Sequence, residues 1–523
     1  MIQLICERIS KTSLKHCLAL LSLVLTPFIL YSVYWYSATK RLSLLLLVIV
    51  FTILLLTLLV LFGINCLNTL RRNLSVYAAV LSFFCLIFVF IFPPLTVADE
   101  DHHFAATYWM ANCVTGSGSW TDSSTLLMRP EDAALLFDET NPRISESSYR
   151  HILEYASPFS KSEEMVSIDI DEHFTLSING DNLITKIPSI VGVVLARALN
   201  LGSYPLFYLG RIFSCVAYVA CCVIAVKKTP VAKSAFIVAS MLPMSLNLAA
   251  SYSYDCGIIG ISFLFLSFTL RAIFLEKKLS ITELITIAVS ATLLAPCKVV
   301  YSFEFLLIFL IPTDRFSSKR NGLLFKLGVI ACALVSILIL RFTTLAAMTT
   351  GGTSRHAEPF TLATLLNNPY ETISIFARTL IEQGDFYILS SIGSYLGWLQ
   401  SELGAPFYFI IAYIICALYS VQPSTGDSSI LSARHKVLFF VIGTLILFSS
   451  MLALLLDWTS FGSSIIQGVQ GRYLLPVMPL IIMLFRCESI KNNTNALPFS
   501  LVSISAINTF YMVQFFARAL LLF

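Results

Sequence analysis

Long apolar runs, separated by short polar or charged stretches, dominate the pattern of this chain. Runs of about 20 residues recur along most of its length, and an α-helix of that length can cross a bilayer. Taking each run between flanking charges or turn residues, we expect about thirteen membrane-spanning helices. Their expected positions are 18–37, 43–66, 76–95, 205–226, 234–252, 256–275, 281–297, 299–313, 322–345, 404–421, 436–456, 472–486 and 497–520.

The composition agrees with a polytopic, all-α membrane protein. Hydrophobic residues make up 57% of the chain and charged residues only 12%, which is more apolar surface than a water-soluble fold could bury. The first apolar run has the basic start of a secretory signal, but it continues to Tyr36 without a convincing small-residue cleavage site. We therefore interpret it as a retained span.

The distribution of charge predicts the orientation in the membrane. With the N-terminus in the cytoplasm, most cations near span ends fall in cytoplasmic loops, as the positive-inside rule requires; Lys40 and Arg41 are the exception. Residues 96–185 then lie outside, with 16 acidic and 4 cationic side chains, so their net charge is 4 − 16 = −12. The whole chain is +4, so the remainder carries +16, and nucleic acid is an improbable partner for this acidic loop.

Several functional classes are disfavoured by what the sequence lacks. No glycine-rich phosphate loop of the P-loop or Rossmann type follows an expected strand, which argues against ATP-driven transport. The 13 cysteines form no CxxC zinc pattern or disulfide framework. Function must therefore lie in the membrane domain and in two outer loops, expected at 96–204 and 346–403.

Five consecutive ionisable residues emerge directly from the span at 76–95, and they are the strongest candidates for chemistry. They are Asp99, Glu100, Asp101, His102 and His103. If a helix begins after Ala98, carboxylate and imidazole groups share one face, which suits a general base or a divalent-metal site. Asp99 or Glu100 is the candidate base, and the three acidic residues are the candidate ligands of Mg²⁺ or Mn²⁺. The alternative is that the acids only cap a helix.

Two cations and a further acid are expected at outer span ends. Arg472 and Lys298 could neutralise a phosphate, Arg472 by two-point contact, and Gly471 would allow close backbone approach. Asp255 could bind sugar hydroxyls or help to hold a metal. The alternatives are that both cations reach towards lipid headgroups and that Asp255 is an ordinary helix cap.

Four local motifs, in order along the chain, carry a resemblance to a known family. The motifs are Pro93-Pro94 followed by Asp99-Glu100 and His103-Phe104; Leu242-Pro243-Met244 leading to Ser251-Tyr252-Ser253-Tyr254-Asp255; Lys298 to Tyr301 after Ala295-Pro296; and Gly468-Val469-Gln470-Gly471-Arg472-Tyr473 running to Pro476, with Leu396-Gly397-Trp398 as a supplement. Over about residues 76–490 the chain resembles a bacterial family of multi-span membrane proteins of unassigned function, grouped with the GT-C superfamily of lipid-linked-sugar glycosyltransferases.

That resemblance implies a GT-C-like helical bundle whose first long outer loop carries an acidic catalytic residue facing a polyprenyl-phosphate sugar. Residues 1–75 would be a two-span addition to a membrane domain at 76–523. The expected catalytic residues are Asp99 and Glu100, and the expected substrate-binding residues are His103, Asp255, Lys298, Gln470, Arg472 and Tyr473.

The working hypothesis is a multi-pass glycosyltransferase of the bacterial inner membrane, of inverting GT-C type. It would move a sugar from a polyprenyl-phosphate donor to a cell-envelope glycan or lipid on the outer side, among membrane lipids and without nucleic acid. Two alternatives remain open: a transporter or flippase for lipid-linked glycans, and a non-catalytic scaffold for envelope assembly. A transporter would need ionisable residues deep within its spans.

Overall fold

The computed structural model describes most of the chain from Leu70 onwards. The described residues are 70–120, 122, 124–137, 144–162, 164–170, 182–339, 360–398, 403–424, 430–490 and 496–522. The spans predicted at 18–37 and 43–66 lie outside them, as does almost all of the predicted addition at 1–75.

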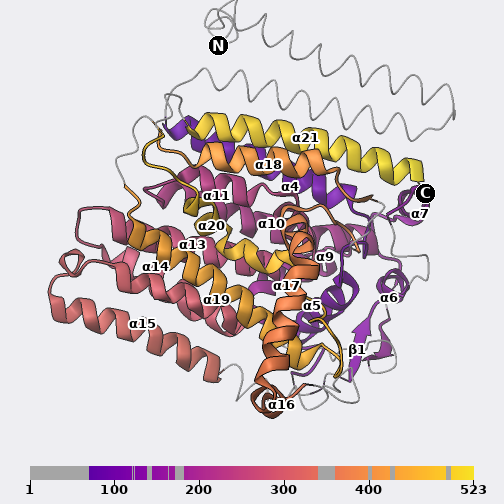
Figure 1. Ribbon diagram of the computed structural model, residues 1–523. Helices are drawn as coiled ribbons and strands as arrows, with labels where there is room; N and C mark the ends of the chain where they lie inside the picture. The colour runs from indigo at the N-terminus through magenta and orange to yellow at the C-terminus, as the bar shows by residue number, and fades with distance from the viewer. Residues whose placement is uncertain are drawn as a thin grey trace, which may run out of the picture.

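Long apolar helices lying roughly along one common direction form the body of the protein (Figure 1). In the described part of the chain, six helices are long and apolar enough to cross a membrane, which confirms a multi-pass helical protein. Ile281–Cys297, Val299–Leu310, Phe407–Ser420 and Gly471–Leu484 are shorter apolar segments. The six long helices are α4 (Leu70–Ile91), α10 (Ser203–Lys228), α13 (Asp255–Phe274), α15 (Lys319–Ile339), α19 (Ala433–Asp457) and α21 (Ala496–Leu522).

Other apolar stretches are shorter or broken, which the hydrophobic pattern alone did not predict. The span expected at 234–252 is two helices that meet at Pro243, because proline lacks the N–H and its ring clashes with the preceding turn. The stretch expected at 472–486 divides into a 3₁₀ and an α segment. The elements are α11 (Lys233–Ser240), α12 (Pro243–Ala249), α14 (Ile281–Cys297), the 3₁₀ helices η1 (Val299–Leu310), η2 (Thr313–Arg315) and η5 (Gly471–Val477), α18 (Phe407–Ser420) and α20 (Met478–Leu484).

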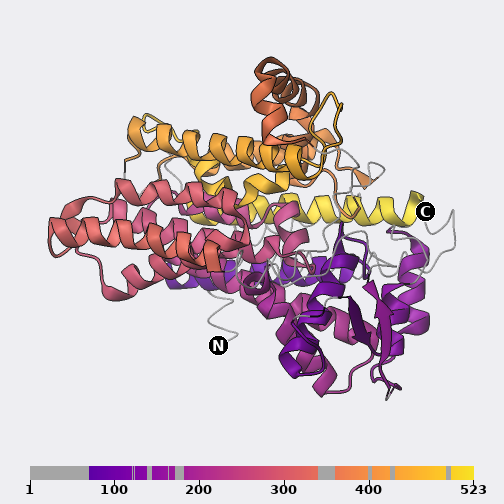
Figure 2. The same cartoon turned by 90° about the horizontal axis from the view of Figure 1, so that it is seen from below.

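A small module that contains α5 lies at one end of this bundle (Figure 2). We call this end of the bundle the α5 end. Its core is aromatic and includes Phe104, Trp109 and Phe207, all at most 1% exposed. It also holds a two-stranded antiparallel sheet in which Thr125 pairs with Asp169, a departure from the all-α prediction. The elements are α5 (Glu100–Thr115), β1 (Thr125–Met128), α6 (Pro130–Leu136), α7 (Glu146–Tyr155), β2 (Val166–Asp169) and α9 (Leu183–Ala198).

One long helix runs across the others. The prediction treated residues 346–403 as an outer loop, but they contain α16 (Leu362–Asn367) and the 24-residue α17 (Pro369–Ile392). In Figure 1, α17 crosses the direction of α19 and α21, and in Figure 2 it is viewed nearly along its axis. Its apolar side packs on α19 through a separate core cluster that includes Ile375 and Met451.

Candidate functional site

The acidic segment before α5 follows a turn that distant residues hold in place. Leu95 and Asp99 both adopt the left-handed backbone conformation, with φ of 63° and 59°. The indole Nε1 of Trp398 donates to the carbonyl of Leu95 at 2.9 Å, and the carbonyl of Gly397 accepts from the backbone N–H of Ala98 at 3.2 Å. Such backbone strain persists only where neighbouring contacts enforce it. The loop that follows α17, which contains Gly397 and Trp398, therefore fixes the direction in which Asp99 projects.

The side chains of Asp99 and Glu100 point in different directions and contact different arginines. Glu100 is fully buried, and its carboxylate accepts hydrogen bonds from Nε of Arg211 at 2.8 Å and from Nη2 of Arg211 at 2.5 Å. The backbone N–H of Tyr252 donates to the same carboxylate at 3.2 Å. This geometry does not favour Glu100 as the general base, because both carboxylate oxygens accept hydrogen bonds inside the fold, away from solvent.

Asp99 instead belongs to a group of four charged residues from distant parts of the chain, here called the charge cluster: Asp99, Asp255, Lys298 and Arg472. The Nη2 of Arg472 lies 3.3 Å from Oδ2 of Asp99, and its Nε lies 3.7 Å from Oδ2 of Asp255. The Nζ of Lys298 lies 3.2 Å from Oδ1 of Asp255. All four residues lie at element boundaries: Asp99 immediately precedes α5, Asp255 begins α13, Lys298 separates α14 from η1, and Arg472 is the second residue of η5.

Aromatic rings border the charge cluster. The Nζ of Lys298 lies 4.3 Å from the ring centroid of Tyr473 and 5.1 Å from that of Tyr254, within cation–π range. The hydroxyl of Tyr301 donates to the backbone carbonyl of Tyr473 at 3.1 Å, which ties η5 to η1. Lys298 and Arg472 are thus confined by rings and carboxylates, and their side chains are 24% and 10% exposed. The alternative that they reach freely towards headgroups is not what this geometry favours.

His103 lies one turn into α5, against the same aromatic rings. Its ring meets that of Tyr254 edge-on at 5.1 Å, and its backbone carbonyl accepts from Nζ of Lys186 at 3.2 Å. Burial lowers the pKa of His103 well below its ordinary value, and the nearby charge of Lys186 lowers it further. The imidazole is therefore neutral at pH 7. The sequence analysis did not identify Lys186 as a candidate site residue, although it is the one charged residue in the mainly apolar stretch Leu183–Val194.

Two buried nitrogens beside the charge cluster have no hydrogen-bond partner. They are Nε of Arg472 and Nδ1 of His103. A buried polar atom without a partner costs free energy comparable to a lost hydrogen bond, and such atoms at native sites require an explanation. An anionic or hydroxylated ligand would supply the missing oxygen atoms.

Gly471 of the fourth motif positions Arg472 within the charge cluster. A Cβ on Gly471 would lie 1.9 Å from the carbonyl oxygen of Tyr387 and 2.5 Å from the backbone nitrogen of Ser391, so no larger residue fits there. The backbone N–H of Gly471 donates to Oγ of Ser390 at 2.9 Å. The close approach of η5 to α17 thus depends on this glycine.

The predicted acidic metal site is not assembled by these residues. Glu100 points to Arg211, so Asp99, Glu100 and Asp101 do not converge, and the described residues contain no group of three His, Cys, Asp or Glu that could hold a metal ion. Asp99 is the N-cap residue of α5, and Glu100 and Asp101 lie in its first turn, so the helix-cap alternative is right in position, although the side chain of Asp99 makes no capping hydrogen bond. Gln470 immediately precedes η5, and its side chain is half-buried. The structure therefore brings together Asp99, His103, Asp255, Lys298, Arg472 and Tyr473.

Comparison with known proteins identifies the family. A family model described as "predicted membrane protein (DUF2142)" matches residues 81–481. The chain belongs to this DUF2142 family. The matched segment contains the whole charge cluster together with His103, Lys186 and the bordering tyrosines, and it confirms the expected membrane nature. Searches of curated proteins and of solved structures found no match.

Proposed function

We propose that this DUF2142 protein is a membrane glycosyltransferase of GT-C type that uses a polyprenyl-phosphate sugar as donor. The observation that supports this most is the convergence of one exposed carboxylate and two confined cations at a single end of the helical bundle. Asp99 is 51% exposed at its side chain, so an acceptor hydroxyl can reach it. Arg472 and Lys298 supply the positive charge that a phosphate leaving group requires.

In the proposed reaction, the carboxylate of Asp99 accepts the proton of the acceptor hydroxyl while that oxygen attacks the anomeric carbon of the sugar. The bond between this carbon and the phosphate oxygen breaks, and the electron pair leaves with the polyprenyl phosphate. Arg472 and Lys298 stabilise the charge that develops on the phosphate, and the free Nε of Arg472 gives it an additional donor. Attack opposite the leaving group inverts the anomeric centre.

The remaining predictions extend this proposal. The acceptor is a cell-envelope glycan or lipid, the membrane is the bacterial inner membrane, and the α5 end is its outer side. A divalent metal such as Mg²⁺ or Mn²⁺ would have to be held by Asp99 and Asp255 together with the donor phosphate, because the described protein groups alone do not form a site.

The experiment is mass spectrometry of envelope glycans and polyprenyl-linked sugars from three strains: wild type, deletion and Asp99→Asn. We expect one sugar to be missing from the glycans of the deletion and Asp99→Asn strains, with the lipid-linked donor accumulating. The matched control is Asp314→Asn, since Asp314 is another exposed carboxylate paired with one arginine at 3.3 Å, outside the charge cluster. Normal glycans in the Asp99→Asn strain would refute Asp99 as the base.

A second candidate, a transporter for the same lipid-linked glycan, is favoured by one observation. Glu304 of η1 is fully buried among apolar helices and bonds to Ser262 of α13, while its Oε2 has no hydrogen-bond partner. Buried carboxyl groups within a membrane domain often mark transport pathways. An assay with purified protein in detergent separates the two functions, because transfer needs no sealed compartments; a product formed there supports the transferase, and its absence with active transport in vesicles supports the rival.

A further inference from the structure

The free surface of α17 carries two parallel stripes of opposite character. One stripe is apolar and highly exposed: Ile373 is 69% exposed, Ile381 83% and Ile388 57%. Residues seven or eight apart lie above one another on a helix, so these isoleucines form a line, which Tyr370 in the first turn of α17 continues. Leu366 of the preceding helix α16 is also highly exposed. The second stripe holds Glu371, Arg378, Glu382 and Asp385, all exposed.

The direction of α17 suits a helix that lies in the plane of a bilayer. It crosses the spans in Figure 1 and is viewed nearly end-on in Figure 2, so its axis is transverse to them in both views. It also packs beside the half of α19 that leads to the α5 end, since Met451 and Leu455 belong to the same cluster as Ile375. A transverse helix at that level lies near the membrane surface.

The contacts of α17 show which stripe faces the membrane interior. Phe376 stacks on Phe448 at 5.9 Å, and Phe448 precedes the end of α19 at Asp457 by two and a half turns, a depth of about 13 Å. On the other side, Oγ1 of Thr379 accepts from the backbone N–H of Ile466, in the loop beyond α19.

Each stripe lies next to one of these two sides of α17. Ile373 precedes Phe376 by one helical turn, so the apolar stripe adjoins the deep side. Glu382 follows Thr379 by one turn, so the charged stripe adjoins the loop side. Phe448 is itself 39% exposed and Phe440 62%, which makes the apolar stripe continuous with the free apolar face of α19.

We propose that α16 and α17 form an amphipathic element embedded in the bilayer interface, with the apolar stripe among acyl chains and the charged stripe among lipid headgroups. The occupant of the apolar stripe is therefore membrane lipid. This inference requires the membrane location of the protein and is independent of the transferase reaction.

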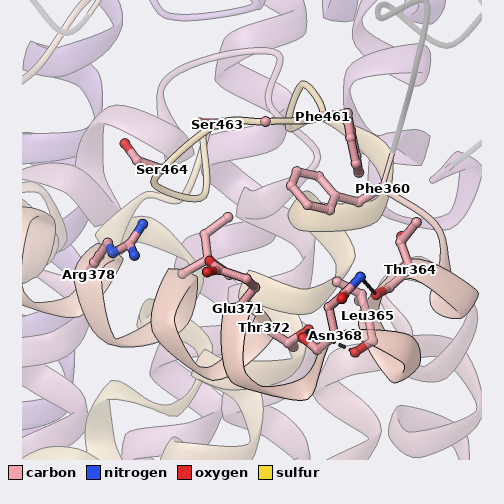
Figure 3. A pocket seen from close by; sticks show the side chains of 12 residues that line it. Phe360, Thr364, Leu365, Asn368, Glu371, Thr372, Arg378, Phe461, Ser463 and Ser464 are labelled. Atoms are coloured by element: carbon pink, nitrogen blue, oxygen red, sulfur yellow. Dashed lines mark hydrogen bonds between the residues drawn. The ribbon is translucent and has the colours of Figure 1, made fainter.

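The pocket beside the charged stripe agrees with a headgroup environment. It lies between α16, the first half of α17 and the loop at 461–464, and Figure 3 shows Phe360 and Phe461 at one end and Arg378 at the other. Glu371 and Ser464 also line it. Aromatic rings next to charged and hydroxyl groups are typical of the zone between acyl chains and water.

The embedded element would also fix the height of the charge cluster relative to the lipid phosphates. The last turns of α17 hold Gly471 through the hydroxyl of Ser390 and lie so close to it that a Cβ there would meet the carbonyl of Tyr387. Arg472 follows directly. A helix anchored in the interface therefore keeps the guanidinium of Arg472 close to the level at which lipid phosphates lie.

Site-specific photo-crosslinking of the full chain in nanodiscs of phosphatidylethanolamine and phosphatidylglycerol tests the proposal. A benzophenone amino acid is introduced singly at Ile373 and Ile381, with Glu371 and Glu382 as matched controls on the charged stripe. We expect several-fold more lipid adduct at both isoleucine positions than at either control, measured by intact-protein mass spectrometry. A second measurement uses a smaller side chain: lipids brominated deep in their acyl chains should quench Ile381→Trp fluorescence more than Glu382→Trp fluorescence.

Three results would overturn the proposal. Equal lipid adducts at the four positions would mean that the stripes do not differ in lipid contact. A crosslinked dimer through Ile381 would assign the stripe to a second copy of the chain, and an internal crosslink would assign it to another segment of the same chain.

Discussion

Two neighbouring acidic residues, Asp99 and Glu100, have opposite surroundings although each meets an arginine. Glu100 and Arg211 are both completely buried and joined by two hydrogen bonds. The guanidinium of Arg211 also donates to the backbone carbonyls of Val89, Phe92 and Pro93. Asp99 and Arg472, by contrast, share one contact of 3.3 Å, and the Nε of Arg472 has no hydrogen-bond partner.

These different surroundings indicate that the Glu100–Arg211 pair stabilises the fold and that the Asp99–Arg472 pair can bind a ligand. A buried ion pair whose donors and acceptors are satisfied cannot exchange partners without leaving a charge in a low-dielectric interior. A half-exposed pair contributes little to stability, and its incomplete hydrogen bonding allows a ligand to replace one partner. The Glu100 pair therefore holds α5 against α10, whereas the charge cluster is available for chemistry.

The largest effect is expected when the buried pair is broken. Arg211→Met leaves the carboxylate of Glu100 buried without its counter-ion, so the free energy of unfolding should fall by about 3–5 kcal/mol. Thermal unfolding of the purified protein in one detergent measures this as a lower melting temperature.

The same substitution in the other arginine is the control. Arg472→Met should lower the free energy of unfolding less than Arg211→Met does, because the half-exposed carboxylate of Asp99 can be solvated and Asp255 keeps its contact with Lys298. If Arg211→Met and Arg472→Met melted alike, the division between a structural pair and an open cluster would be wrong.

Gly471→Ala should have the next largest effect, through the position of Arg472. The added methyl group meets the backbone of α17 and not a flexible side chain, so η5 must shift, at a cost of about 1–3 kcal/mol. Donor use should fall as well, since Arg472 moves with it.

The control for this change is Gly328→Ala in the middle of α15, where a Cβ would meet nothing within 4 Å. Alanine favours a helix interior, so this variant should be more stable by about 0.5–1 kcal/mol. Melting temperatures and initial transfer rates of both variants are the measurements, and a Gly471→Ala protein with the properties of Gly328→Ala would show that η5 is not held as described.

Much of the helical framework follows from the sequence because burial in lipid demands long apolar runs. The ends of α10, α13 and α19 lie within a few residues of the expected spans. The break at Pro243 and the transverse α17 were not predicted: a hydropathy window averages over a kink, and α17 carries charges along one stripe that resemble a loop.

The candidate site was predicted in its membership more than in its geometry. Arg472, Lys298 and Asp255 were identified as candidates at span ends, and they do meet. The separation of Asp99 from Glu100 depends on one left-handed residue and on Arg211, which lies 111 positions further along the chain. No local pattern encodes such a partner, since it arises only when α10 packs beside α4.

Arg472→Lys tests the open cluster more finely than removal of the charge. Lysine retains the positive charge but loses the planar fork, so one of two phosphate contacts should be lost and kcat/KM for the donor should fall by roughly tenfold. Initial rates at varied donor concentration measure it. The control is Arg315→Lys, whose arginine also contacts one aspartate at 3.3 Å but lies outside the cluster; equal rates for both variants would remove Arg472 from the donor site.

The smallest effect is expected at His103, a residue of α5 that lies between the buried Glu100–Arg211 pair and the charge cluster. Burial lowers its pKa in the folded protein well below 6.5, with further lowering by Lys186 and His102. Above about pH 6.5 the imidazole is neutral in both states, so it adds no pH dependence. As the pH falls below that value, the unfolded chain binds a proton that the folded protein does not, and the free energy of unfolding decreases by up to about 1.4 kcal/mol per pH unit.

His103→Gln should remove this part of the pH dependence. We expect the melting temperatures of the parent and the variant to differ by a constant amount between pH 8 and pH 7, and the parent to lose stability faster between pH 6.5 and pH 5.5. A ligand phosphate that accepts a hydrogen bond from the unpartnered Nδ1 would favour the protonated ring, so added polyprenyl phosphate should flatten the slope of the parent alone. Parallel curves for the two proteins at every pH would show that the fold does not lower the pKa of His103, and the ligand site would then rest on the charge cluster alone.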